Sequence, residues 1–392
     1  MKQTLILPRW GTFAMFLANG FGFGAWATGI APLKAMLSLS AGSLSLALLA
    51  MSIGGLIAMQ PASHLTQRLG GTGKAAQIAS FAFPIALSLP FLSPNLPVLM
   101  AACALMGATG CVMGVSINAH ASHLETRWGA PIMSSFHAGF SLGGLLGTGF
   151  GALLLSLHVP THLLMLPAAI GVLSIVALGS GFLGEGDTTK HEGQPMFRLP
   201  ERAIWGLAAI LTLCFMSEGA MADWSGIYLT TLGESPARAA AGYAAFSATM
   251  VLGRLTGDAI VHRFGRSLVI GLGCALAALG LVLATAVPTL AAVVTGFAFV
   301  GIGFSNVVPC VLSSAAQRAS TPAAGIAAVS TAGFGGFLSG PPLIGAVAAH
   351  HGMRAGIGVI AVAATLAALL SLRLLPRSSA VPPAAVLGTG AD

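Results

Sequence analysis

The sequence predicts an all-α integral membrane protein with twelve transmembrane helices in two six-helix bundles. Three observations predict this fold class: the scarcity of charge, the recurrence of long apolar segments, and short matches between the two halves of the chain. Of the 392 residues, 56% are hydrophobic and only 7% are charged, whereas a soluble domain carries about 25% charged residues. Such a chain cannot cover an ordinary water-facing surface, so it is expected to lie in a lipid bilayer.

Twelve apolar segments are long enough to cross a membrane, because a bilayer core needs roughly 20 apolar residues in a helix. Short polar breaks separate them, and glycine, with 52 residues, is abundant enough to let such helices approach closely. The segments fall at approximately 10–33, 43–63, 75–92, 97–121, 131–155, 162–183, 203–229, 240–261, 268–286, 289–314, 325–349 and 354–375.

The basic residues predict that both termini face the cytoplasm of a bacterial inner membrane. With the N-terminus inside, thirteen lysines and arginines fall in inner segments, whereas only Lys34, Arg238 and Arg354 fall in outer loops. This is the positive-inside bias of membrane proteins. The net charge of +7 therefore reflects topology, and because no P-loop, basic run or dinucleotide fingerprint is present, no nucleic acid is expected as a partner.

The longest polar stretch, 184–202, falls near the middle of the chain and is predicted to be a cytoplasmic linker. It separates an N-terminal six-helix bundle, 1–183, from a C-terminal six-helix bundle, 203–376. The remaining residues, 377–392, are expected to form a disordered cytoplasmic tail.

The two predicted bundles share short sequence matches at a common spacing. R-L-G at 68–70 matches R-F-G at 263–265, and A-G-F at 138–140 recurs at 332–334. Both spacings are close to half the chain length. The matches indicate two parallel repeats, the relationship between the halves of some transporters.

These features resemble the major facilitator superfamily over nearly the whole chain. Its loop motif, G-x-x-x-D-R-x-G-R, has a partial copy at 258–266, which keeps R-x-G-R but has His262 at the Asp position. Another copy, at 63–71, keeps only the first arginine and glycine. The resemblance implies that this region closes the cytoplasmic side, so the inner-gate candidates here are Arg68, Arg263 and Arg266.

Three further stretches resemble the MosC-like branch of bacterial inner-membrane proteins. They are INAHASHLE with PIMSSFHAGFSLGGLLG within 117–147, EGAMADWSGIYL at 218–229, and GFLSGPPLIG at 336–345. This resemblance implies a secondary transporter, with an inositol-like compound suggested for the namesake of the branch.

Two carboxylates, Glu218 and Asp223, interrupt the apolar segment at 203–229. A charged group in a membrane costs roughly 2.5–3.5 kcal/mol on insertion scales, so it normally faces a cavity or a partner. Glu218 is expected about 22 Å from the cytoplasmic end, and five residues turn Asp223 about 140° away from it around the helix. We predict that both acids take part in proton coupling, with Glu218 the principal site. The alternative is a neutral, hydrogen-bonded carboxylic acid that holds two helices together.

Arg254 and Asp258 are four residues apart, the spacing of an ion pair on one helix face. They are predicted to form a structural or inner-gate pair rather than to contact substrate. Arg254 is expected about 11 Å from the inner end of its helix, so it is not paired with the deeper Glu218.

His137 is a further proton-coupling candidate, because imidazole titrates near neutrality; packing or capping is its alternative role. His120, His123 and Glu125 fall at the predicted inner end of a span without an evident fourth ligand. They are interpreted as polar residues at a loop edge, and no metal or other cofactor is predicted.

Amide and indole side chains in the spans are the candidates for contact with a solute. An amide can bond a hydroxylated solute, and an indole face can stack on a sugar or bind a cation. Amides also join helices, and Trp also favours membrane interfaces. The substrate-binding candidates are Asn19, Trp26, Asn118, Trp224 and Asn306.

The function predicted from the sequence is alternating-access secondary transport of a small solute by a monomer, driven by protons. No Lys or Arg is expected near the middle of a span, which favours a neutral polar solute such as a sugar or cyclitol over an anion. One alternative is a multidrug or metabolite exporter of the same fold whose acids bind cationic substrates. Another is a membrane receptor or scaffold that does not transport. No nucleophile–base or metal constellation converges, so no enzyme is predicted.

Overall fold

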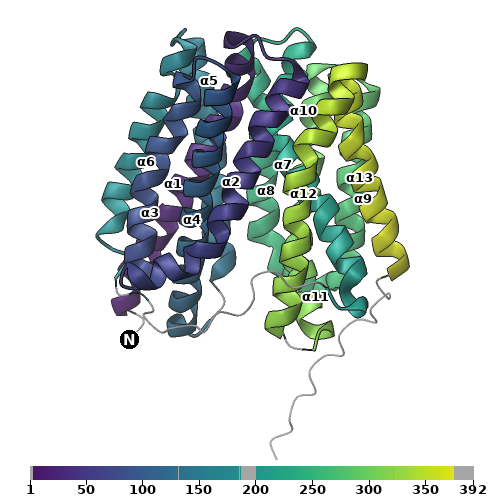
Figure 1. The fold of residues 1–392 in the computed structure, drawn as a ribbon. Helices are drawn as coiled ribbons and strands as arrows, with labels where there is room; N and C mark the ends of the chain where they lie inside the picture. Colours follow the sequence, from purple (N-terminus) through teal and green to yellow (C-terminus); the bar gives the residue numbers. More distant parts are fainter. Residues whose placement is uncertain (1–2, 131, 185, 187–199, 321, 375–392) are drawn as a thin grey trace, which may run out of the picture.

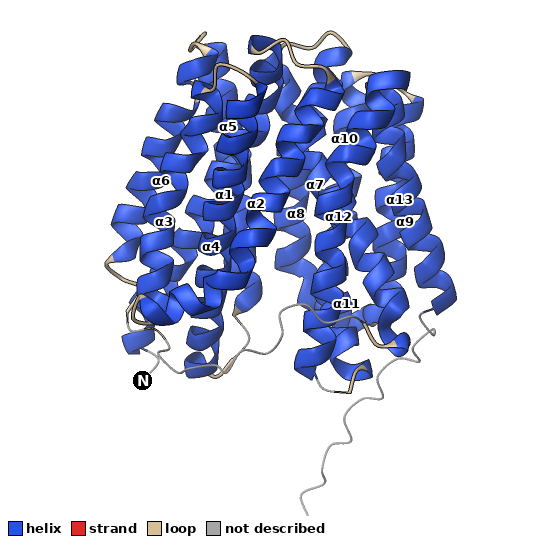
Figure 2. Ribbon diagram, in the orientation of Figure 1, coloured by secondary structure: helices blue, strands red, loops and turns tan. Residues whose placement is uncertain are grey.

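The computed structural model describes residues 3–374 except 131, 185, 187–199 and 321, and it gives backbone alone for 60, 63–67, 258, 322, 323 and 374. In the part described, all regular structure is helical (Figure 2). The α-helices are α1 (Ile6–Met36), α2 (Ala41–Arg68), α3 (Thr72–Ser88), α4 (Leu96–Trp128), α5 (Met133–Ser156), α6 (Met165–Ser180), α7 (Trp205–Thr231), α8 (Pro236–Phe264), α9 (Arg266–Ala286), α10 (Leu290–Phe304), α11 (Val307–Arg318), α12 (Pro322–His351) and α13 (Met353–Leu374).

Eleven segments of the described chain are long and apolar enough to cross a membrane, with α10 and α11 forming one of them. The remaining predicted span is α8, which has 29 residues. It carries charged side chains, including Arg238, Arg254 and Arg263. It packs among the other spans, against α5, α7 and α10. The twelve predicted spans are therefore all present as helices.

The helices form two bundles, with α1–α6 in one and α7–α13 in the other (Figure 1). We call the end of the molecule at which α1 begins and α13 ends the inner end, following the predicted orientation. The predicted tail, 377–392, and most of the predicted linker, 184–202, lie outside the described residues. The exact domain boundaries therefore stay a prediction.

The matched R-L-G and R-F-G stretches form equivalent tight turns at the inner end. After α2 the chain turns through Gly70 and Gly71, with φ of 90° and 106°, before α3 begins. After α8 it turns through Gly265, with a φ of 77°, before α9 begins. Glycine adopts positive φ without the steric penalty of a Cβ atom. The repeat in the sequence thus marks equivalent places in the two bundles.

The first helix of each bundle packs against an equivalent partner, α1 on α5 and α7 on α12. A Cβ atom on Gly143 of α5 would overlap the carbonyl oxygen of Leu17, and one on Gly336 of α12 would overlap that of Thr212. The Thr212 hydroxyl also donates to the Ala332 carbonyl at 2.8 Å. Small residues let these backbones approach closely, as is common between membrane helices.

This packing predicts different effects for two glycines on the same helix. A Cβ atom on Gly147 would overlap the backbone of Phe21 in α1, whereas one on Gly149 meets no atom within 4 Å. We expect Gly147→Ala to destabilise the protein by about 1–3 kcal/mol through overpacking. Gly149→Ala should leave stability unchanged or raise it by up to about 1 kcal/mol, since Ala favours helix. Tm values of both variants in detergent check this, and equal Tm values would contradict it.

The two bundles meet closely in the outer half of the molecule. A Cβ atom on Gly345 of α12 would overlap Ser45 of α2, and the ideal Cβ position of Gly226 on α7 is 3.7 Å from the carbonyl oxygen of Ala27 on α1. Nearer the middle, the Ser52 hydroxyl of α2 donates to the Phe337 carbonyl of α12 at 3.3 Å. These contacts close the outer side between the bundles.

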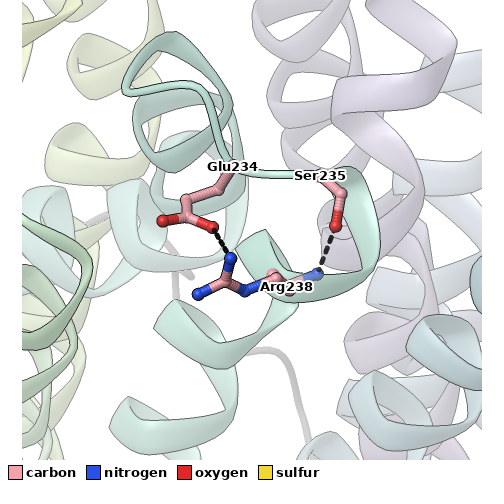
Figure 3. Close-up of polar contacts among 3 residues, drawn as sticks. All are labelled: Glu234, Ser235 and Arg238. Atoms are coloured by element: carbon pink, nitrogen blue, oxygen red, sulfur yellow. Dashed lines mark hydrogen bonds and ion pairs between the residues drawn. The ribbon is translucent and has the colours of Figure 1, made fainter.

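The loop between α7 and α8 at the outer end is fixed by local polar contacts (Figure 3). The Ser235 hydroxyl accepts a hydrogen bond from the Arg238 backbone N–H at 3.4 Å and caps the start of α8. The Arg238 guanidinium is 3.0 Å from Glu234, and its side chain is 67% exposed. Such an exposed pair contributes little to stability, about 0–1 kcal/mol.

Candidate functional site

Glu218 lies at the midpoint of α7, thirteen residues from either end, and Asp223 lies five residues nearer the outer end. At 1.5 Å per residue, Glu218 is about 20 Å from the inner end of the helix. The Glu218 side chain is half-buried, and its Oε1 atom is buried without a hydrogen-bond partner. Asp223 is 8% exposed. The two acids therefore have different surroundings on one helix.

The Arg254 side chain of α8 connects the two bundles at mid-depth. Its Nη1 atom donates to the Ser141 hydroxyl of α5 at 2.7 Å and to the His137 carbonyl at 3.3 Å. Arg254 also lies within reach of the charge of Glu218 on α7. The Arg254 guanidinium thus interacts electrostatically with Glu218, the predicted proton site in its own bundle, while it is hydrogen-bonded to α5 of the other bundle.

The position of Arg254 corrects the depth expected from the sequence. Helix α8 continues to Phe264, so Arg254 lies ten residues, or about 15 Å, from its inner end. That is half the thickness of a bilayer core of about 30 Å. The expectation that no arginine lies near the middle of a span was wrong, because the predicted end of this helix at 261 was too early. Arg254 and Glu218 are electrostatic neighbours, but no ion pair joins them among the described residues, so the prediction that they are not paired is not contradicted.

Tyr243 of α8 is an electrostatic neighbour of both acids, and the sequence analysis missed it. Its hydroxyl and that of Ser247 both lie near Gly144 of α5, and its electrostatic neighbours include Asp223, Glu218 and Arg254. Both Tyr243 and Ser247 are buried. The sequence did contain a signal for Tyr243. The chain has only two tyrosines, and this one lies in the span that follows the two acids, which makes it a reasonable candidate for the site.

Several buried polar atoms on the first helix of each bundle have no hydrogen-bond partner. On α1 these belong to Asn19 and Trp26, and on α7 to Glu218, Trp224 and Ser225. Asn19 lies thirteen residues after the start of α1, the same distance at which Glu218 follows the start of α7. An unpaired buried polar group is costly, so a cluster at equivalent places in both bundles indicates groups kept available for a solute, water or a proton.

The two tryptophans lie within their own bundles. Trp26 is 1% exposed and meets Phe91 edge-on, with ring centroids 5.9 Å apart. Trp224 is fully buried, and the next turn carries Tyr228, whose hydroxyl donates to the Ala284 carbonyl of α9. The indole faces are therefore packed against protein, and stacking on a solute stays a prediction for both.

The two remaining amide candidates make hydrogen bonds to backbone. Asn118 is half-buried and donates to the Gly114 carbonyl of its own helix at 2.8 Å. Asn306 lies at the break between α10 and α11 and donates to the Gly253 carbonyl of α8 at 2.9 Å. Asn306 thus joins two helices beside Arg254, and substrate contact by either amide stays a prediction.

The histidines and Glu125 near the inner end have structural contacts that the sequence did not suggest. His120 is only 1% exposed inside α4, where its ring nitrogens contact the Thr72 hydroxyl at 3.3 Å and the Leu183 carbonyl at 3.0 Å. Glu125 accepts 2.7 Å hydrogen bonds from two backbone N–H groups at the start of α5. The loop-edge interpretation was wrong for His120, because α4 extends to Trp128.

His137 lies in the first turns of α5, and its ring meets Phe16 edge-on with centroids 5.3 Å apart. Arg68 ends α2, Arg266 begins α9, and Arg263 lies over the Phe264 ring at 5.4 Å. The Asp258 side chain lies outside what the structure describes. Its pairing with Arg254 and the inner-gate role of these residues therefore remain predictions.

Sequence comparisons identify the family of this chain. The model of the Major Facilitator Superfamily matches residues 12–335. The chain belongs to the major facilitator superfamily. An MFS-type transporter of Yersinia pestis is 35% identical over 364 residues, covering 92% of this chain and 94% of the relative. The membrane protein MosC of Rhizobium meliloti is 32% identical over 360 residues, covering 90% of this chain and 86% of MosC.

Solved structures of the superfamily share this fold. The crystal structure of the D323A mutant of the nucleoside transporter NupG superposes with a TM-score of 0.76 over 94% of this chain and all of that chain, at 12% identity. Another NupG crystal structure gives a TM-score of 0.71 at 15% identity, covering 94% of this chain and 98% of that chain. At these identities the likeness shows the fold alone. Membership of the superfamily makes the protein a multi-pass membrane transporter of a small-molecule solute, without enzymatic activity.

Proposed function

We propose that the protein is a proton-coupled, alternating-access transporter of a small polar solute in a bacterial inner membrane. One observation carries the proposal: Glu218 lies at mid-depth on α7 with an unpartnered buried oxygen, within reach of an arginine that is bonded to the opposite bundle. Intramembrane acids of this kind commonly mark ion pathways.

In this mechanism, the charge of Glu218 is linked to the contact between α8 and α5. When Glu218 is ionised, it attracts the Arg254 guanidinium and competes with Ser141 for it. When Glu218 is protonated, the attraction ends, and Arg254 is left to its hydrogen bonds with Ser141 and the His137 carbonyl. Binding of one proton therefore changes the free energy of the contact between the two bundles.

The solute is proposed to bind between Asn19 and Glu218, the equivalent residues of α1 and α7. The amide oxygen of Asn19 and one oxygen of Glu218 are both buried without a partner. Together they accept hydrogen bonds from hydroxyl or amine groups of a solute. A hydroxyl-rich neutral solute such as a sugar, a cyclitol or a nucleoside fits this chemistry, and nucleosides are included because the solved relative NupG is a nucleoside transporter.

A second candidate follows from the balance of charge at the site. Two acids, Glu218 and Asp223, accompany one arginine, Arg254, so the earlier argument for a neutral solute from the absence of basic groups no longer applies. An excess of acid favours an exporter of organic cations. A drug-susceptibility screen of a deletion strain tests this candidate, since loss of an exporter raises sensitivity to its substrates.

The decisive experiment begins with a thermal-shift screen of the purified protein at two pH values. It uses sugars, cyclitols, nucleosides, amino acids and cationic drugs. Any stabilising compound is then tested for flux into proteoliposomes with and without an imposed pH gradient. Flux that follows the gradient supports the proposal, flux without dependence on the gradient excludes proton coupling, and binding without flux indicates a receptor.

A further inference from the structure

Three phenylalanine side chains lie beside Glu218, on α7 and α12. The rings of Phe215 and Phe337 are stacked with centroids 4.8 Å apart, and Phe334 meets Phe337 edge-on at 6.2 Å. A Cβ atom on Gly219, the residue after Glu218, would lie 2.8 Å from the Phe337 ring. We call Phe215, Phe334 and Phe337 the aromatic cluster. The cluster therefore lies at the depth of the proposed proton site.

The aromatic cluster faces the opposite bundle rather than the lipid. On α12, Gly335 is exposed, and no described atom lies within 4 Å of its ideal Cβ position, so it marks the lipid-facing side. Phe337 follows two residues later, or about 200° around the helix. On α7, Gly219 precedes Gly226 by about two turns, and Gly226 approaches the Ala27 carbonyl of α1. Both helices thus direct this side towards the space between the bundles.

The rings of the aromatic cluster are only half-buried. Phenylalanines of the packed core, such as Phe297 and Phe304, are 0% exposed. Helix α2 of the opposite bundle reaches α12 at this depth, where the Ser52 hydroxyl donates to the Phe337 carbonyl at 3.3 Å, but it does not cover the rings. An uncovered apolar surface beside a few polar groups is typical of a ligand site.

The A-G-F repeat places an aromatic residue at the equivalent position of the other bundle. Phe334 ends one copy, and Phe140 of α5 ends the other. The Phe140 ring lies 6.2 Å from the ring of Phe23, which follows Asn19 by about one turn of α1. A Cβ atom on Gly20 would overlap the Phe140 carbonyl oxygen, so Phe140 lies at the depth of Asn19. Aromatic side chains thus accompany both residues that are proposed to bind the solute.

We propose that the aromatic cluster stacks on a ring of the solute, so that this transporter takes solutes that carry an aromatic ring beside their hydrogen-bond donors. The ring lies against Phe337, and the donors reach the unpartnered oxygens of Glu218 and Asn19. Packed aromatic rings gain affinity beyond the area that they bury. A free sugar or cyclitol carries hydroxyls around its whole ring, and these would lose water against phenylalanine without gaining a hydrogen bond. The inference rests on the proposed solute site, and it narrows the solute to nucleosides, aryl glycosides and similar compounds.

The test compares pairs of compounds that differ only in an aromatic ring. Phenyl and methyl derivatives of glucose, ribose and myo-inositol, together with purine and pyrimidine nucleosides, are titrated against the purified full chain at a fixed pH. Binding is read from the thermal shift. We expect the aryl member of at least one pair to bind about tenfold more tightly than its methyl partner. The absence of any such preference across the pairs would overturn the proposal.

Phe337→Leu keeps an apolar side chain but removes the aromatic face. It should reduce the aryl preference by about two- to tenfold and leave the affinity for the methyl compounds unchanged. Phe334→Leu tests the same cluster if Phe337→Leu fails to fold. Phe81→Leu is the matched control, because Phe81 is 37% exposed on α3, and it should keep the parental preference. A parental preference in both cluster variants would contradict the stacking role.

A separate arm distinguishes stacking on a ring from binding of a cation. Aromatic faces also attract cations such as tetramethylammonium. Binding of this ion that Phe337→Leu abolishes, without binding of any neutral aryl compound, would overturn the proposal in favour of a cation site. These measurements use no pH gradient, so a failure of proton-coupled flux leaves the aryl preference unaffected. Conversely, absence of the preference does not affect proton-coupled flux of a solute without a ring, so the two failures are distinguishable.

Discussion

Glu218→Gln is expected to abolish proton-driven accumulation while leaving solute exchange intact. A pH difference of one unit supplies about 1.4 kcal/mol per proton, which can support about tenfold accumulation of a neutral solute. The amide keeps the shape of the carboxylic acid but cannot exchange a proton. The accumulation ratio in proteoliposomes should therefore fall from about tenfold to one, while counterflow of labelled against unlabelled solute continues.

The matched control for this experiment is Glu234→Gln, in the loop between α7 and α8. Glu234 pairs with the exposed Arg238 side chain, and loss of such a pair typically changes stability by less than about 1 kcal/mol. This variant should accumulate solute as the parent does. Accumulation that persists in Glu218→Gln would show that another group carries the proton. Loss of both accumulation and exchange would indicate that solute binding needs the carboxylate of Glu218 and that the amide oxygen cannot replace it as an acceptor.

The features that depend on local composition were predictable from the sequence. Span length, the glycine turns after α2 and α8, and the equivalence of α5 and α12 all follow from apolar runs and from repeated short matches. Each reflects a constraint that acts on neighbouring residues or on one helix at a time. This is why the fold was predictable although the contacts between helices were not.

The contacts of the polar residues depend on which helices meet, and the sequence does not show this directly. The sequence predicted a partner for Arg254 on its own helix, and that pairing stays a prediction because the Asp258 side chain is outside the described part. The sequence did not indicate the bonds that Arg254 makes to α5. His120 was assigned to a loop edge, but it is buried against α3 and the end of α6. An error of three residues in the end of α8 was enough to place Arg254 about 4 Å too close to the inner end of its helix.

Arg254→Gln provides the strongest test of the link between the bundles. The variant removes the donor that joins α8 to Ser141 and the His137 carbonyl, and it removes the positive charge near Glu218. Loss of a hydrogen bond from a charged group costs about 1.5–3 kcal/mol. We expect a lower Tm and no accumulation of solute. Arg238→Gln, at the exposed surface of the same helix, is the matched control and should change stability by less than about 0.5 kcal/mol.

The double variant Glu218→Gln with Arg254→Gln distinguishes an electrostatic link from two independent roles. If the charge of Arg254 stabilises ionised Glu218, part of the stability lost in Arg254→Gln comes from this interaction, and it cannot be lost again once the acid is gone. The loss in free energy of unfolding of the double variant should therefore be smaller than the sum of the losses of the two single variants by about 0.5–3 kcal/mol. Strictly additive losses of stability would contradict the coupling proposed between these residues. Transport is not expected to recover together with stability. The double variant lacks the proposed proton site at Glu218, and it also lacks the arginine that links this site to α5. A recovered Tm together with absent accumulation is therefore the combined outcome expected if Arg254 transmits the protonation of Glu218 to the opposite bundle.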